Sequence, residues 1–75
     1  MKFVLPDGKE VAGRSYGDIV RQMNDEKFTP ATNIDTYRRQ LAKRVESLYG
    51  KVVDATTDKT LVSDLVDIGL LVRLP

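Results

Sequence analysis

The stretch KFVLPDGKEVA, residues 2–12, decides the fold class because it has the residue pattern of a β-hairpin. Its turn, residues 6–8, combines a proline with a fixed φ, an aspartate that can accept a backbone N–H, and a glycine for the left-handed position. A type I turn with a glycine bulge pairs Phe3 with Val11 across the two strands. We therefore expect Phe3, Leu5 and Val11 to share the inner face of a small sheet.

Helical patterns follow the hairpin. A helix is expected to begin after Ser15, which stands three residues before Asp18 in the spacing of a capping box. The strongest pattern covers residues 34–49, where apolar residues recur three and four positions apart and a glycine comes directly after them. A third, short helix is expected over residues 61–68. We also expect Phe28 to reach the core from the loop that follows the first helix.

The chain closes with a strand pattern over residues 70–74. Leu70, Val72 and Leu74 occupy alternate positions, which predicts an apolar face made of these side chains. Since helices connect this strand to the hairpin, we expect it to lie beside the first strand and parallel to it. The pattern leaves open whether residues 52–53 form a further short strand.

These elements predict an α+β fold in a single compact domain over residues 1–75. An N-terminal β-hairpin and a C-terminal strand should form a small sheet, packed by two to three helices on one face. The expected core consists of Phe3, Leu5, Val11, Ile19, Val20, Met23, Leu41, Val45, Leu48, Leu65, Ile68 and Val72.

The order of the turns also resembles a known architecture. A Leu-Pro-Asp-Gly hairpin, a helix, and a closing strand after an Ile-Gly turn are similar to the frame of a β-grasp, or ubiquitin-like, domain. The resemblance covers only the two ends of the chain, since the long helix expected at residues 34–49 departs from it. It is an architectural analogy, and it implies no site residues.

The composition excludes several kinds of chemistry. With 75 residues and neither cysteine nor histidine, the chain has no disulfide and lacks the common ligands of zinc and iron–sulfur sites. The aspartates within residues 54–67 suggest a calcium loop, but Lys59 stands where such a loop needs its glycine. No histidine can act as base for a nucleophilic serine. We therefore expect a non-enzymatic protein without catalytic residues, metal or cofactor.

The middle of the chain is basic, although the formal net charge is only +1. Residues 38–51 carry five cations and one carboxylate, whereas residues 52–67 carry four carboxylates and one cation. The stretch TYRRQLAKRV, residues 36–45, places this charge on the expected second helix. Since each helical residue turns about 100°, Arg39 and Lys43 lie together opposite the apolar stripe, and the other arginines flank it.

Three interpretations of this basic helix remain open. It can be a solvated face with ordinary ion pairs, a phosphate-binding face suited to guanidinium groups, or a contact for an acidic patch on a protein partner. Because Arg38 lies near the apolar edge, we expect it to snorkel or to meet a carboxylate of the acidic third helix. The candidate partner- or phosphate-binding residues are Tyr37, Arg38, Arg39, Lys43, Arg44 and Lys51.

Size, charge distribution and missing catalytic chemistry favour a small protein-binding or regulatory module that acts on a larger protein partner. The alternative is a nucleic-acid-binding domain that contacts phosphates through the basic helix at residues 34–49. A monomer or a weak homodimer is expected. No secretory signal pattern and no apolar run of membrane-spanning length is present, so we expect a cytoplasmic protein without membrane contact. The profile is typical of accessory proteins encoded by phages and mobile elements.

Overall fold

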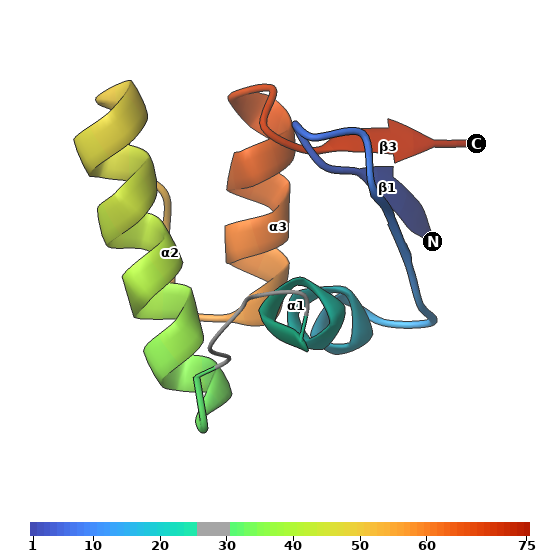
Figure 1. Cartoon of the computed structure of the whole chain (residues 1–75), viewed down its shortest axis with the longest axis horizontal. Helices are drawn as coiled ribbons and strands as arrows, with labels where there is room; N and C mark the ends of the chain where they lie inside the picture. The colour runs from blue at the N-terminus through green and yellow to red at the C-terminus, as the bar shows by residue number, and fades with distance from the viewer. Residues whose placement is uncertain (26–30) are drawn as a thin grey trace.

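The computed structural model of the chain describes residues 1–25 and 31–75. Over these residues it has an antiparallel sheet in the order β2-β1-β3 and three helices (Figure 1). The α+β fold and the joining of the hairpin by a C-terminal strand are therefore confirmed. The expected position of Phe28 lies outside the described residues. The elements are β1 (Lys2–Val4), β2 (Glu10–Ala12), α1 (Tyr16–Asp25), α2 (Ile34–Tyr49), α3 (Asp58–Asp67) and β3 (Val72–Leu74).

The hairpin has the predicted register. Phe3 lies opposite Val11, and each side chain is 1% exposed. The turn closes because the N–H of Leu5 donates to the carbonyl of Lys9 at 2.8 Å, and the N–H of Gly8 donates to the carbonyl of Leu5 at 2.9 Å. Gly8 has a φ of +90°, which a residue with a side chain rarely adopts. The local turn chemistry thus determines this part of the sheet.

The first two helices begin at polar caps. At the start of α1, the hydroxyl of Ser15 accepts the N–H of Asp18 at 3.2 Å, and the Asp18 carboxylate accepts the N–H of Arg14 at 3.0 Å. A Cβ on Gly13 would come within 2.4 Å of the Cβ of Asp18, so this approach requires glycine. Helix α2 begins at Asn33, whose side-chain oxygen accepts the N–H of Asp35 at 2.8 Å.

The last helix ends in the expected Schellman pattern. The N–H of Leu70 donates to the carbonyl of Leu65 at 2.9 Å, and the N–H of Gly69 donates to the carbonyl of Val66 at 3.1 Å. These bonds satisfy carbonyls that the helix leaves unpaired. They also turn the chain sharply from α3 into β3, so they set the place where the closing strand begins.

The closing strand runs antiparallel to β1, so the expectation of a parallel strand was wrong. Helix α3 ends beside the hairpin turn, toward which β1 runs (Figure 1). A strand that starts there must return toward the N-terminus, against the direction of β1. The likeness to a β-grasp frame is therefore limited to two features: the hairpin, and the position of the last strand beside β1.

The predicted apolar face of the closing strand was also wrong, by one residue. Arg73 lies directly opposite Phe3 and therefore on the inner face, with its Cζ 6.0 Å from the centroid of the Phe3 ring. Leu71 is on the same side and is 2% exposed, whereas Val72 is 55% exposed. A shift of one residue moves every side chain of a strand to the other face.

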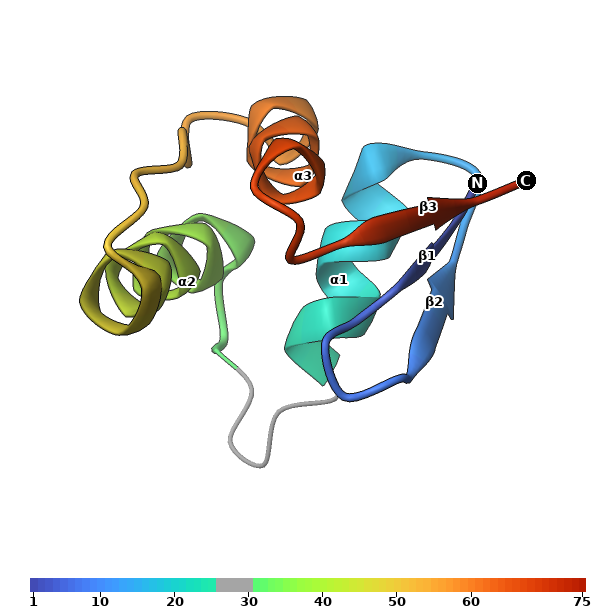
Figure 2. The same ribbon diagram turned by 90° about the horizontal axis from the view of Figure 1, so that it is seen from above.

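Helices α1 and α3 cover one face of the sheet, and α2 lies beyond them on the side away from the strands (Figure 2). The expectation that two to three helices pack on one face is confirmed in this form. The loop before α2 is tied to the end of α1 by Asn24, a buried residue. Its side-chain amide donates to the carbonyl of Ala31 at 2.9 Å, and its side-chain oxygen accepts the N–H of Ala31 at 3.0 Å.

Most of the predicted core is buried, but its limits differ. Leu5, Leu41 and Ile68 lie half-buried at its edge. Leu48 and Val72 are exposed, so their assignment to the core was wrong. Residues 52–53 form no strand, although the side chain of one of them is buried. The buried apolar residues are Phe3, Val11, Ile19, Val20, Met23, Tyr37, Val45, Val53, Leu61, Val62, Leu65 and Leu71.

Candidate binding groove and the basic helix

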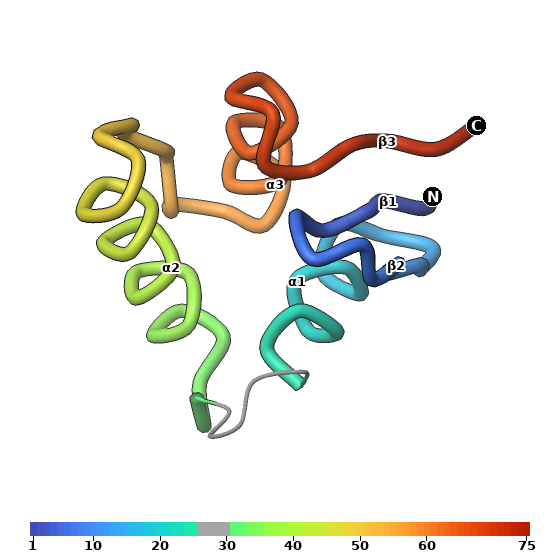
Figure 3. Tube along the Cα trace, turned by 45° about the horizontal axis from the view of Figure 1, so that its top comes forward, coloured from blue at the N-terminus to red at the C-terminus, as the bar shows by residue number. Residues whose placement is uncertain are grey.

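An apolar groove of about 320 Å³ lies between the C-terminal half of α2, the hairpin turn and the segment after α3. In Figure 3, α2 lies on one side of the molecule, and the hairpin turn and α3 lie toward the other. Ligand pockets in proteins have volumes from about 300 Å³ upward, so the groove is at the small end of that range. Its lining residues are Leu5, Pro6, Asp7, Lys9, Met23, Tyr37, Leu41, Arg44, Val45, Leu48, Tyr49, Leu65, Leu70 and Leu71.

One wall of the groove is the apolar stripe of α2. Tyr37 and Val45 are buried in this stripe, with 3% and 2% exposure. One turn further on, the exposed fractions are 67% for Leu48 and 52% for Tyr49. The stripe therefore extends beyond the part of the core that it packs against. This explains why the helical pattern wrongly assigned Leu48 to the core: periodicity gives the face of a helix but not its neighbour.

Charged groups stand on both walls. Lys9 comes from the hairpin and Arg44 from α2, and neither forms an ion pair with another described residue. Asp7 is the carboxylate residue among those lining the groove, and its Oδ1 already accepts the N–H of Lys9 at 3.0 Å. Burial raises the pKa of the Tyr37 hydroxyl to about 12, although the positive charge of Arg44 acts in the opposite direction. The groove is thus apolar inside, with Lys9 and Asp7 at its hairpin edge and Arg44 at its α2 edge, which leaves an excess of one positive charge among these three residues.

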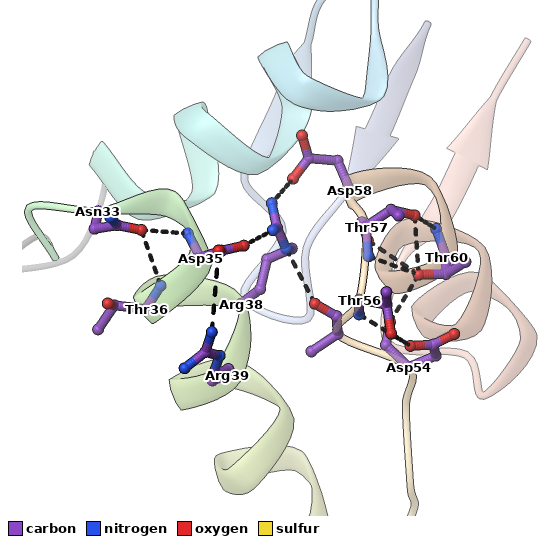
Figure 4. A network of polar contacts seen from close by, with 11 residues as sticks. Asn33, Asp35, Thr36, Arg38, Arg39, Asp54, Thr56, Thr57, Asp58 and Thr60 are labelled. Atoms are coloured by element: carbon purple, nitrogen blue, oxygen red, sulfur yellow. Dashed lines mark hydrogen bonds and ion pairs between the residues drawn. The ribbon is translucent and has the colours of Figure 1, made fainter.

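Arg38 belongs to an internal network on another side of α2 (Figure 4). Its Nη1 donates to Oδ1 of Asp58 at 2.6 Å, its Nε donates to the carbonyl of Ala55 at 3.1 Å, and it also pairs with Asp35. Only 12% of the Arg38 side chain is exposed. Asp58 is the first residue of α3, so the expectation that Arg38 meets a carboxylate of the third helix is confirmed.

The other cations are spread around α2. The Arg39 side chain is 75% exposed, and its Nη2 lies 4.0 Å from Oδ2 of Asp35. Lys43 is exposed one turn further along the helix, and Lys51 is exposed just beyond Gly50. The sequence-predicted residues are therefore divided: Arg38 faces α3, Arg44 and Tyr37 line the groove, and Arg39 and Lys43 face outward. They do not form one continuous patch.

The acidic residues before and within α3 mostly support local structure. Oδ1 of Asp54 accepts the N–H and the hydroxyl of Thr56, at 2.9 and 2.5 Å, and these bonds lower the pKa of the Asp54 carboxyl. Oδ2 of Asp64 accepts the N–H of Asp54 at 2.8 Å. Thr57 and Thr60 form a capping box at the start of α3. Within residues 1–25 and 31–75, no cluster of carboxylates is arranged to hold a metal ion.

Comparison of this chain with protein-family models, with curated proteins and with solved structures found no match. None of the helices built from described residues combines the length and the apolar character needed to cross a membrane.

Proposed function

We propose that the chain is a small non-enzymatic protein-binding module that docks a larger protein in the groove between α2 and the hairpin turn. The observation that carries this proposal is the exposure of Leu48 and Tyr49 on the wall of an apolar groove. Leucine and tyrosine at such exposure leave apolar area in water, and contiguous area of this kind marks interaction sites in soluble proteins. A partner that covers the groove would remove this area from water.

The residues that line the groove are better suited to binding than to catalysis. Its titratable side chains include Asp7, whose carboxylate is held by the turn, and Tyr37, whose hydroxyl stays protonated at neutral pH because its pKa is about 12. Lys9 and Arg44 are cations at the edges. General acid–base catalysis needs a group that titrates near the working pH and reaches a reacting atom. These residues instead supply charge at the border of an apolar surface, as in many protein interfaces.

Site-specific photo-crosslinking tests the proposal. A photoreactive phenylalanine analogue is placed at Leu48, on the groove wall, and in a matched variant at Lys43, on the outer side of the same helix. In cells of the source organism, we expect a discrete protein adduct from position 48 and none from position 43. Equal adducts from both positions, or none from either, would contradict docking in the groove.

Nucleic-acid binding is the second candidate, and it is supported by the exposure of Arg39 and Lys43 on the outer side of α2. Since Arg38 is engaged internally and Arg44 lines the groove, Lys51 is the further exposed cation that could join Arg39 and Lys43. For roughly three phosphates neutralised, the logarithm of the affinity for duplex DNA should fall with a slope of about −3 against the logarithm of salt concentration. Fluorescence polarisation measures this slope. Binding that persists after Arg39→Glu with Lys43→Glu would refute this candidate.

A further inference from the structure

We infer that the occupant of the groove is an amphipathic helix of a partner protein, with acidic residues on both sides of its apolar stripe. This inference rests on the proposed function and names the kind of partner. An apolar groove walled by a helix is a recurring site for such a segment, which inserts side chains at positions i, i+3, i+4 and i+7. The volume of about 320 Å³ holds a small number of large apolar side chains, rather than a folded surface.

The charges on the two walls specify the flanks of that helix. Lys9 lies on the hairpin wall and Arg44 on the α2 wall, so a helix between them meets a cation on each side. Neither cation forms an ion pair with another described residue. Asp7 keeps its negative charge on the hairpin wall beside Lys9, although its Oδ1 accepts the backbone N–H of Lys9, so the α2 wall with Arg44 is the more positive of the two. A carboxylate on the flank that meets Arg44, and one on the other flank placed at Lys9, would therefore be complementary, whereas lysine beside Arg44 would be repelled.

A second copy of this chain fits the groove poorly. Near its exposed end, the apolar stripe of its α2 is flanked by Arg44, so that helix would bring a positive charge to a groove that already holds Lys9 and Arg44. Helix α3 carries acidic residues, but its apolar residues Leu61 and Leu65 are buried in its own core, with 0% and 2% exposure. Neither helix supplies an available apolar face with acidic flanks, which favours a helix from another protein.

The test uses two synthetic helical peptides with the same leucine stripe. The first has glutamate at every flanking position, and the second has lysine at those positions. Affinity for the full chain is measured by fluorescence polarisation, and the binding site is mapped from amide chemical shifts in NMR spectra. We expect the acidic peptide to bind about tenfold more tightly than the basic one, because Lys9 and Arg44 outnumber Asp7 at the edges of the groove. The shifted amides should belong to Leu41, Leu48 and Leu70.

Two double variants, which change the net charge by the same amount, show which cations cause the preference for the acidic peptide. Lys9→Glu with Arg44→Glu should reverse it, so that the basic peptide binds more tightly. Arg39→Glu with Lys43→Glu changes the outer side of α2 and should leave the preference as it was. All four side chains are exposed, so both proteins should fold, which circular-dichroism melting verifies.

Each other outcome overturns the inference in a distinguishable way. Equal affinity for both peptides would refute the acidic flanks, and no binding by either would refute a helical occupant. In both cases an adduct from position 48 but not from position 43 would leave the proposed function standing. Self-association that is removed by Leu48→Asp would show that a second copy fills the groove. Loss of the position 48 adduct would instead refute the proposed function itself.

Discussion

Arg38 shows how a single charged residue can be used inside a small protein. Its side chain is only 12% exposed, and its guanidinium group reaches Asp58, the carbonyl of Ala55 and Asp35 at once. A guanidinium group presents several donors in one plane, so it can join groups that an ammonium group cannot reach together. Arg38 therefore links α2 to the loop before α3 and to the start of α3.

Replacing Arg38 with alanine should lower the free energy of unfolding by about 1–3 kcal/mol, because the carboxylate of Asp58 and the carbonyl of Ala55 lose a partly buried partner. Arg39→Ala is the matched control, and its cost should stay below about 0.5 kcal/mol because that side chain is exposed. Urea denaturation followed by circular dichroism measures both values. Equal losses for the two variants would contradict the bridging role of Arg38.

Tyr37 should make the stability of the fold depend on pH in the alkaline range. Burial raises the pKa of its hydroxyl from 10.0 to about 12, so the folded protein holds this proton more tightly than the unfolded chain does. The resulting stabilisation is fully present below pH 10 and is lost as the pH rises toward 12. Urea denaturation across this range should show a steeper decrease in the free energy of unfolding for the natural protein than for Tyr37→Phe. The same dependence in both would refute this role.

At the scale of elements, the register of β3 decides which of two neighbouring apolar residues, Leu71 just before the strand or Val72 at its start, is buried. Leu71 faces the core and Val72 faces solvent. Leu71→Ala should therefore lower the free energy of unfolding by about 2–5 kcal/mol, as loss of a buried leucine does. Val72→Ala removes a smaller, exposed side chain and should cost less than about 1 kcal/mol. Thermal melting of the two variants compares them, and a larger effect at Val72 would contradict the observed register.

The apolar stripe of α2 has a part that is buried in the core and a part that is exposed. The stripe is buried at Tyr37 and Val45, whereas Leu48, one turn after Val45, is exposed on the wall of the groove. Asn33 caps the start of the helix, and Gly50 ends it with an N–H bond to the carbonyl of Glu46 at 2.9 Å. The proposed binding surface therefore includes the exposed end of α2, which the core does not cover.

At the scale of the molecule, the described residues fill an ellipsoid of 29 × 26 × 22 Å with a radius of gyration of 11.2 Å. A compact chain of this length has a radius of about 11 Å. The acidic stretch is largely engaged within the chain, since Asp58 pairs with Arg38 and Asp64 accepts the N–H of Asp54. A dimer in which the acidic helix of one copy meets the basic helix of another therefore has few free carboxylates to use.

We expect a monomer of 8.4 kDa at both low and near-physiological salt concentration. Sedimentation equilibrium at the two salt concentrations measures the mass directly. A mass near twice this value at low salt that falls when salt is added would show an electrostatic dimer and contradict the expectation.

The features that the sequence by itself determined are those with local causes. The hairpin register follows from the turn at residues 6–8, and the ends of the helices follow from Ser15, Gly50 and Gly69. The hydrogen bonds that decide these features join residues only a few positions apart, so short patterns are enough to predict them. The α+β class follows from the order of these elements. Even the inward position of Arg38 was indicated by its place at the edge of an apolar stripe.

Only the tertiary structure decided the direction of β3, the burial of Leu71 in place of Val72, and the groove beside Leu48. Strand direction depends on where α3 ends relative to the hairpin turn, which is a contact between residues far apart in the chain. In a strand with apolar residues at both Leu71 and Val72, alternation does not identify the inner face. A helical stripe likewise predicts which side chains share a face, but whether another element covers them depends on how the helices pack. Leu48 remained uncovered for that reason, and the candidate site is the space that this packing leaves open.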